Sequence, residues 1–319
     1  MTNRQYSCTS NTAKLLKHLD KLQMLQSGTV SPIMVHMVPT HRCQMKCVHC
    51  CFKNRKNKHL DMPYSVLAEG IKQFHSLGVR SIELTGGGDP TLYPYINEAL
   101  SYLYGLDFHI GMITNAIDSH KVNCWYYCDW VRVSLNVLDY DDPLNLEQIE
   151  KSGTYISFCY IWNERTTQDI FDKVVQISNE KKIVCRVAPD CICSLKEIDE
   201  SLVEIQETLS RYKNNEFAFL SDFNISTSRK NTDCRIHMIK PCFYADGNIY
   251  SCPSSELSVE HGHQMSKAAQ LCKHDEVFDF YGSGRALEKT TRTCTFCKYV
   301  LQQNFLEELL METTFNEFA

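Results

Sequence analysis

Apolar residues follow two different spacings that alternate over the first two hundred positions of the chain. Short apolar runs rich in β-branched and aromatic residues predict buried strands, and they lie at 33–39, 81–87, 108–115, 130–137, 155–162 and 182–189. Between them, apolar residues recur every three or four positions, which predicts helices at 63–77, 93–104, 118–128, 143–152, 166–181 and 195–212. Leucines at the same spacing predict one more helix at 12–26, before Gly28.

This alternation predicts an α/β fold with a parallel sheet and right-handed crossovers. A doubly wound sheet fits the order, but chemistry placed at the carboxyl ends of the strands favours a partial (β/α)6 TIM-like barrel. The regular pattern ends near residue 213; short β-like runs, a turn at 245–248 and a final helical segment follow. We therefore expect an N-terminal helix at 1–30, the barrel at 31–213 and a small cysteine-rich C-terminal α+β domain at 214–319.

Composition narrows the class of protein. The 319 residues carry a net charge of −5, which argues against a surface built to coat nucleic acid. No run approaches the roughly 20 apolar residues of a membrane span, and the N-terminus lacks the apolar centre of a signal peptide. We therefore expect a cytoplasmic protein with neither a membrane nor a nucleic acid as direct partner. Seventeen cysteines in a reducing compartment point to metal or redox chemistry rather than disulfides.

Three of these cysteines, Cys43, Cys47 and Cys50, have the spacing C-x3-C-x2-C in the loop after the first predicted strand. A tight loop can bring three thiolates to a common centre and leave one metal position open to another molecule. Zinc is the alternative metal, with Cys51 or His49 as a fourth ligand.

The segment "CQMKCVHC" resembles the signature of the radical S-adenosylmethionine (radical SAM) superfamily, with His49 as the aromatic-type residue before the last cysteine. The resemblance implies that Cys43, Cys47 and Cys50 hold a [4Fe–4S] cluster whose fourth iron is chelated by S-adenosylmethionine (SAM). It also implies reductive cleavage of SAM to a 5′-deoxyadenosyl radical, which abstracts hydrogen from a substrate. Cys51 matches no ligand of the family and is expected to be a neighbour.

Other segments resemble the superfamily in the same order along the chain. "LTGGGDPTLYP" is similar to its glycine-rich segment, although the family usually has Glu where this chain has Asp89. "GMITNA" and "VRVSLN" are similar to its strand ends that face the ribose or the methionine carboxylate; each polar residue there could instead be satisfied locally. The cofactor-binding residues that the resemblance implies are His49, Gly87, Gly88, Asp89, Thr114, Asn115 and Ser134. Arg186 on the sixth predicted strand could pair with a carboxylate of the cofactor or the substrate, or equally form a salt bridge at the barrel rim. The expected substrate-binding residues are Asn136, Asn163, Asp190 and Asp222.

A second set of cysteines lies in the C-terminal part. Cys234, Gly247, Cys252, Cys294 and Cys297 resemble the pattern of the "twitch" auxiliary-cluster domain, a shorter relative of SPASM. The resemblance implies a second [4Fe–4S] cluster on the four cysteines, with Cys242 as the rival of Cys234. Four thiolates would equally suit a structural zinc ion.

The sequence indicates the substrate and the electron donor less clearly than it indicates the cofactor. The basic run 53–60 could attract an acidic donor such as flavodoxin or ferredoxin, or a phosphate, or simply be solvated. With no peptide-recognition domain before the barrel, we expect a small-molecule substrate. At the level of the whole chain the sequence resembles small radical SAM lyases of gut clostridia that convert queuine to preQ1 in queuosine salvage. A dehydrogenase of a small alcohol, a peptide-modifying (RiPP) maturase and a zinc-binding interaction protein remain the alternatives.

Overall fold

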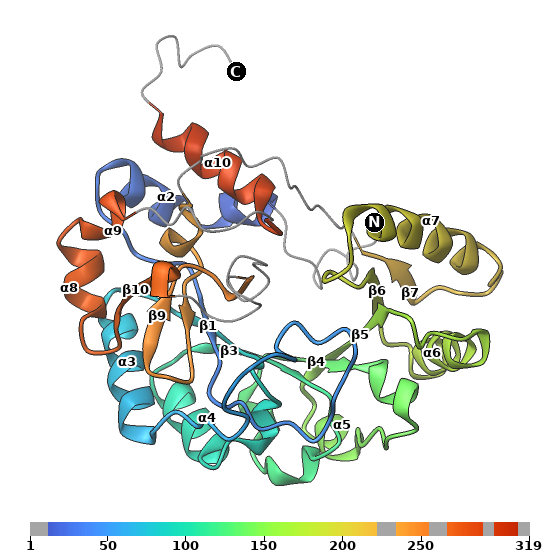
Figure 1. Cartoon of the computed structure of the whole chain (residues 1–319). Coiled ribbons are helices and arrows are strands. Elements are labelled where there is room, and N and C mark those ends of the chain that lie inside the picture. Colours follow the sequence, from blue (N-terminus) through green and yellow to red (C-terminus); the bar gives the residue numbers. More distant parts are fainter. Residues whose placement is uncertain (1–11, 222–233, 255–266, 290–296, 312–319) are drawn as a thin grey trace.

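One ten-stranded sheet organises the protein in the computed structural model, which describes residues 12–221, 234–254, 267–289 and 297–311 (Figure 1). Seven of its strands follow one another in parallel, each paired with the next in the chain. They are β1 (Val35–Met37), β2 (Ser81–Leu84), β3 (His109–Thr114), β4 (Trp130–Ser134), β5 (Tyr155–Trp162), β6 (Cys185–Pro189) and β7 (Ala218–Leu220). This consecutive order is that of a barrel and not of a doubly wound sheet, which reverses direction midway. The sheet stays open, so the predicted partial TIM-like barrel is confirmed.

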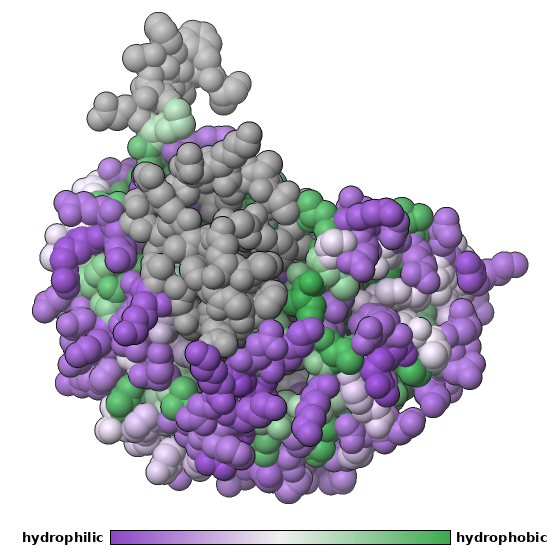
Figure 2. Space-filling view, in the orientation of Figure 1, coloured by the Kyte–Doolittle hydropathy of each residue, from purple (hydrophilic) through white to green (hydrophobic). Residues whose placement is uncertain are grey.

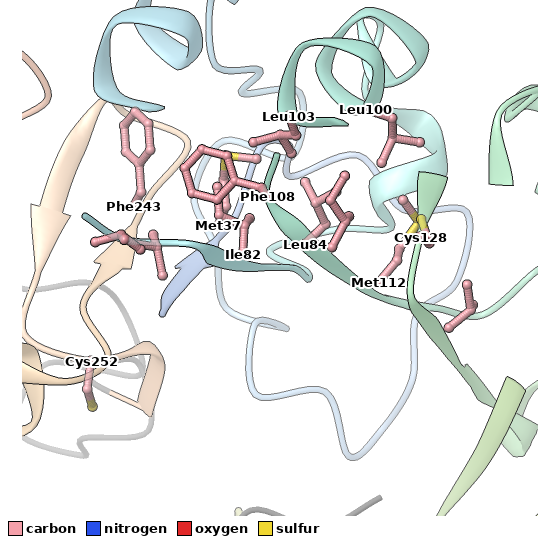
Figure 3. Packing of buried hydrophobic residues seen from close by; sticks show 14 of the residues in the cluster. Met37, Ile82, Leu84, Leu100, Leu103, Phe108, Met112, Cys128, Phe243 and Cys252 are labelled. Carbon is pink, nitrogen blue, oxygen red and sulfur yellow. The ribbon is translucent and has the colours of Figure 1, made fainter. Parts of the chain in front are cut away.

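Helices cover the outer face of the curved sheet (Figure 1). They are α3 (Tyr64–Ser76), α4 (Ile96–Gly105), α5 (Glu147–Lys151), α6 (Gln168–Lys181) and α7 (Leu195–Ser210). Alternate strand residues point outward into one apolar core, where Ile82, Leu84 and Met112 of the strands lie near Leu100 and Leu103 of α4 (Figure 3). The remaining strand residues face the inner, concave side.

The C-terminal part extends the same sheet beyond β1. Strand β8 (Cys242–Phe243) pairs in parallel with β1, and β9 (Asn248–Tyr250) and β10 (Gln270–Lys273) follow in antiparallel pairing. Gly247 closes the β8–β9 turn with φ of +82°, a conformation that glycine adopts at little cost. The predicted turn at 245–248 is therefore confirmed, and it joins two antiparallel strands. The helices here are α8 (Val277–Gly282), α9 (Arg285–Glu288) and α10 (Val300–Leu310).

Several predicted elements differ in the structure. The helix expected at 12–26 is a 3₁₀ turn, η1 (Thr12–Lys17), followed by α2 (Leu19–Gln26), and the helix expected at 143–152 is reduced to α5. Strand β4 ends at Ser134, where the 3₁₀ helix η5 (Leu135–Tyr140) begins. Strand β7 was not predicted, and it carries the parallel sheet past residue 213.

The helix expected at 118–128 is wrong, because only the 3₁₀ turns η3 (Ser119–Lys121) and η4 (Trp125–Tyr127) form there. Side chains satisfy the backbone in place of helical bonds. Asn97 of α4 donates to the carbonyl of Lys121 and accepts from the amide of Asn123, both at 3.0 Å. The Trp125 indole donates to the carbonyl of Ser119 at 3.0 Å.

No helix in the described ranges has the length and apolar character that crossing a bilayer requires.

Candidate active site

The three cysteines of the loop after β1 share one cavity. Cys43, Cys47 and Cys50 line a cavity of about 710 Å³, a size that suits a small ligand. The amide of Cys50 donates to the carbonyl of Cys47 at 3.2 Å, which folds the loop into a tight turn. Burial, together with the charges of neighbouring groups that include Cys50, raises the pKa of the Cys43 thiol to about 11 and that of Cys47 to about 12. The three thiols are thus close enough to influence one another.

The cysteine loop is fixed at its start by an ion pair. The guanidinium of Arg42 binds Asp61 with an Nη2–Oδ2 distance of 2.7 Å, and the Thr40 hydroxyl donates to the same carboxylate at 2.7 Å. In the middle of the loop, the amide of Val48 donates to the Tyr140 hydroxyl at 2.8 Å. Because Tyr140 ends η5, this bond ties the cysteine loop to the carboxyl end of β4.

His41 connects the same loop to the C-terminal hairpin. Its Nδ1 lies 2.6 Å from the carbonyl oxygen of Asn57, and its Nε2 lies 2.8 Å from the Tyr244 hydroxyl. A carbonyl can only accept, so Nδ1 carries the proton. Burial lowers the pKa of His41, so the ring is neutral at pH 7 and Nε2 accepts from Tyr244.

The glycine segment after β2 packs directly beneath the cysteine loop. The amide of Gly88 donates to Thr40 at 2.8 Å and that of Asp89 donates to Arg42 at 2.7 Å. A Cβ on Gly88 would lie 2.0 Å from the carbonyl oxygen of Arg42, and one on Gly87 would lie 2.5 Å from the His41 ring. Only glycine allows this approach. Gly87 and Gly88 also line the cavity, as the sequence predicted for residues that meet the cofactor.

Asp89 organises the strand ends around it. Its carboxylate, only 4% exposed, accepts hydrogen bonds from the amide and hydroxyl of Thr91, from the Thr114 hydroxyl and from the amide of Asn115, at 2.6–3.0 Å. Burial raises the pKa of this carboxyl, and the bonds from Asn115 and Thr91 oppose the rise. Thr114 is thus bound to Asp89, the local alternative left open by the sequence. The shorter Asp in place of Glu fits this bridging position.

Asn115 points toward the cysteine loop. Its side-chain amide nitrogen lies 3.9 Å from Cys43 Sγ, within hydrogen-bonding reach of sulfur, and its Oδ1 accepts from Gln44 at 3.2 Å. A donor of this kind stabilises a thiolate. The structure therefore places Asn115 beside a sulfur that the sequence assigned to the cluster.

A buried polar network at the ends of β4 and β5 holds two residues expected to bind substrate. The carboxylate of Asp139 accepts from Asn136 and Asn163 at 2.9 Å each and from the Tyr160 hydroxyl at 2.8 Å. Asn136 and Asn163 each donate to the carbonyl of Ile161 as well. Asp139, at the centre of the network, was not predicted from the sequence. An acidic residue a few positions past a strand end was the available signal, but its central position follows only from the strand pairing.

The remaining predicted residues occupy separate places. Ser134 caps η5, accepting from the amide of Asn136 at 3.4 Å. Asp190, just after β6, lines the cavity and accepts from the amide of Ile192 at 3.0 Å. Burial lowers the pKa of His49, whose Nδ1 has no hydrogen-bond partner among the described residues. Arg186 lies on the inner face of β6, opposite Cys159 of β5. Asp222 lies outside the described residues.

Basic side chains border the cavity on the side of the run 53–60. Lys46, Lys53, Arg55 and Lys58 all line it, and the surface over this loop is predominantly hydrophilic (Figure 2). Arg55 is fixed by a bond from its Nε to the carbonyl of His41 at 3.0 Å.

The cysteines of the C-terminal part are placed differently. Cys234, Cys242, Cys252 and Cys297 are all buried, and Cys294 lies outside the described residues. The amide of Arg235 donates to the side chain of Gln303 in α10 at 2.7 Å, which holds Cys234 close to the helix that follows Cys297. Cys242 packs instead in an inner apolar cluster with Val38 and Tyr250.

The chemistry of the cysteine loop fits an iron–sulfur cluster. Three cysteines from one loop reach a common cavity, and thiolates are the usual ligands of such clusters. Within residues 12–221, 234–254, 267–289 and 297–311, no three His, Cys, Asp or Glu side chains are already arranged to hold a metal ion. The fit therefore rests on the donor set and on the cavity that its members share.

Comparison with known proteins agrees with this reading of the loop. The profile of the radical SAM superfamily matches residues 37–156, which include the cysteine loop, the glycine segment and the ends of β3 and β4. The S-adenosylmethionine-dependent nucleotide dehydratase of Thermoplasmatales archaeon (strain ISO4-H5) is 25% identical over 108 residues. That match spans 33% of this chain and 38% of the length of the dehydratase.

Solved structures share the fold over most of the chain. Streptococcus suis SuiB bound to the precursor peptide SuiA is 16% identical, with a TM-score of 0.57, over 86% of this chain and 70% of SuiB. The anSMEcpe protein with bound AdoMet is 14% identical, with a TM-score of 0.56, over 88% of this chain and 85% of its own. At these identities the likeness concerns the fold.

Proposed function

Because residues 37–156 match the radical SAM superfamily model, we propose that the protein cleaves SAM reductively and uses the resulting radical on a small-molecule substrate. The observation that carries the proposal is the cavity shared by Cys43, Cys47, Cys50, Gly87 and Gly88. Cys43, Cys47 and Cys50 would hold a [4Fe–4S] cluster, which would supply the electron for cleavage of SAM to methionine and a 5′-deoxyadenosyl radical.

The protein's own residues position and insulate this chemistry. Asn115 donates toward Cys43, and Tyr140 and Asp61 hold the two halves of the cysteine loop. The glycine segment presents backbone groups to the cavity beside the cysteines, where the amino group of SAM would bind. The Asp89 carboxylate accepts hydrogen bonds from Thr114 and Asn115 at the end of β3, and these bonds hold that strand end against the glycine segment.

For the C-terminal part we propose a second metal site on Cys234, Cys252, Cys294 and Cys297. The bond between Arg235 and Gln303 supports it, because it brings Cys234 toward the segment of Cys297. A [4Fe–4S] cluster is the proposed occupant, and zinc is the alternative that metal analysis separates. An acidic electron donor, flavodoxin or ferredoxin, is proposed to approach the basic border formed by Lys46, Lys53 and Lys58.

Anaerobic turnover tests the proposal. Iron-loaded protein, given a strong reductant and SAM, should form 5′-deoxyadenosine and methionine in equal amounts. A panel of queuine, a nucleotide, a small alcohol and a cysteine-containing peptide should contain one compound that raises the yield above the background. Protein that holds four irons per chain yet forms no 5′-deoxyadenosine would contradict the proposal.

A further inference from the structure

A side-chain hydrogen bond joins the start of the cysteine loop to the hairpin of the C-terminal part. Strands β1 and β8 are paired in parallel, and the amide of Val38, just past β1, donates to the carbonyl of Phe243 at 2.8 Å. Beyond this bond both strands have ended, and the contact continues through the side chains of His41 and Tyr244. The Tyr244 hydroxyl lies 2.8 Å from His41 Nε2, and the rings meet edge to face with 5.1 Å between their centres. The pairing of β1 with β8 is thus extended to the cysteine loop.

His41 also closes the cysteine loop on itself. Its amide donates to the carbonyl of Leu60 at 2.8 Å, and its carbonyl accepts from Arg55 Nε at 3.0 Å. Its ring donates through Nδ1 to the carbonyl of Asn57 at 2.6 Å. All three partners follow the cysteines in the chain, so the segment that carries the cysteines leaves and returns at this residue. Because His41 is only 5% exposed, the closed loop takes its position from a buried side chain.

The glycine segment lies against the same ring. A Cβ on Gly87 would come within 2.5 Å of His41 Cδ2, so no side chain could stand between the ring and the backbone of Gly87. Gly87 and the three cysteines line one cavity from two different segments of the chain. The His41 ring therefore sets the spacing between two walls of the cavity, and a shift of the ring would change that spacing.

The hairpin gives the Tyr244 hydroxyl a firm support. Tyr244 is 5% exposed; its amide donates to the carbonyl of Asn248 at 3.0 Å, and its carbonyl accepts from the amide of Gly247 at 2.9 Å. Its ring meets the ring of Tyr250 edge to face, with 5.6 Å between the centres. Loss of the hydroxyl would leave the buried Nε2 of His41 without this donor, and an unsatisfied buried nitrogen favours a shift of the ring.

We propose that Tyr244 is a positioning residue for the cofactor, whose hydroxyl holds the His41 ring so that the cysteine loop and Gly87 keep the spacing that SAM requires. The role in SAM binding rests on the proposed function, whereas the fixing of the cysteine loop does not. By thermodynamic linkage, SAM binding in turn stabilises the hydrogen bond between His41 and Tyr244. The C-terminal part thus sets the affinity of the barrel for SAM.

Removal of the hydroxyl tests this role. The dissociation constant for SAM is measured by equilibrium dialysis on iron-loaded protein without reductant, and Tyr244→Phe should raise it at least fivefold. Tyr250→Phe is the matched control in the same hairpin, because it removes a hydroxyl that donates to Asp246 at 2.6 Å. It should leave the constant within twofold of the wild type. With reductant and saturating SAM, Tyr244→Phe should form 5′-deoxyadenosine at the wild-type rate, since the hydroxyl positions the site and takes no part in the chemistry.

Two further measurements separate the hydrogen bond from a general loss of structure. His41→Leu removes the acceptor, so Tyr244→Phe added to it should weaken SAM binding by less than a further twofold. Amide hydrogen exchange is followed by mass spectrometry on iron-loaded protein without SAM. Exchange across residues 43–50 should be at least fivefold faster in Tyr244→Phe than in the wild type or in Tyr250→Phe.

Each outcome decides between this role and its rivals. Equal SAM affinity in the wild type and Tyr244→Phe would overturn the proposal. Equal losses in Tyr244→Phe and Tyr250→Phe would also overturn it, because the hairpin would then act only as general support, and so would full additivity with His41→Leu. A wild type that binds no SAM would contradict the proposed function, and unchanged amide exchange in Tyr244→Phe would contradict the fixing of the loop separately.

Discussion

The two groups of cysteines differ in how the chain delivers them. Cys43, Cys47 and Cys50 come from one loop, are half-buried and line a cavity. Cys234, Cys252 and Cys297 come from three separate segments and are buried. A metal site with an open position can accept an outside ligand, whereas a closed site stabilises structure or carries electrons. The first group thus suits catalysis, and the second suits a supporting role.

The largest expected effect distinguishes a proposed cluster ligand, Cys47, from a neighbouring cysteine, Cys51. Cys47→Ser should lower the formation of 5′-deoxyadenosine at least 1000-fold, equivalent to about 4 kcal/mol, with little change in melting temperature. Cys51→Ser, the matched control one residue past the motif, should keep both activity and iron. Equal losses in the two variants, measured by chromatography and iron analysis, would contradict the assignment of ligands.

Loss of the Asp89 hydrogen bonds beneath the cysteine loop should have the next largest effect. Asp89→Ala leaves the buried amides of Thr91 and Asn115 without an acceptor, and it should cost about 3 kcal/mol of unfolding free energy. Asp169→Ala, at an exposed position in α6, should change it by less than about 0.5 kcal/mol. Denaturant unfolding measures both, and a small effect at Asp89 would contradict its bridging role.

The Cys252→Ser variant tests the metal site proposed on the buried cysteines of the C-terminal part. We expect a loss of about 2 kcal/mol in stability, since metal binding adds folding free energy, and a fall in iron from about eight to about four atoms per chain. SAM bound to the first cluster should remain detectable. Unchanged iron together with lost zinc would identify a zinc site instead.

We expect a fall in pH to destabilise the folded C-terminal part, because His237 binds a proton more readily in the unfolded chain. Burial lowers the pKa of this fully buried ring to about 4, so the folded state keeps it neutral. The unfolded chain takes up the proton near pH 6.5, so the stabilising contribution is present above that pH and is lost as the pH falls toward 4. Between pH 6.5 and 5 we expect a loss of about 1.5 kcal/mol. The His237→Gln variant should lack this part of the slope, and an identical pH dependence in both proteins would argue against it.

The smallest effect concerns the tie between the cysteine loop and η5. Tyr140→Phe removes the acceptor of the Val48 amide and should cost about 1 kcal/mol. We expect a few-fold rise in the KM for SAM with kcat nearly unchanged. Tyr104→Phe, at an exposed position on α4, is the control. A fall in kcat alone would show that Tyr140 acts in the chemistry and not in positioning.

Local spacing was sufficient to predict most of the fold. Strand β5 has the predicted bounds, and the β8–β9 turn follows from Asp246 and Gly247. The helix at 118–128 failed because Asn97, more than twenty residues away, satisfies its backbone. Strand β7 escaped prediction because its three residues are too few to show a period.

The site was predictable only where the motif itself supplies the atoms. Cys43, Cys47, Cys50, Gly87 and Gly88 of the motifs line one cavity, and Asp190 lines it too, whereas their roles as ligands stay predictions. The expected substrate-binding role of Asn136 and Asn163 stays a prediction, and the sequence did not show that both donate to Asp139 at the meeting of β4 and β5. Such a network depends on strand pairing, which no local pattern contains.

The central claim is that three sulfurs of the cysteine loop leave one iron free for SAM. Electron–nuclear double resonance of the reduced, iron-loaded protein with ¹⁵N-labelled SAM tests it most directly. The account predicts a hyperfine coupling between the cluster and the SAM amino nitrogen, present in wild type and absent in Cys47→Ser. A reduced [4Fe–4S] cluster that shows no coupling to saturating SAM would contradict it.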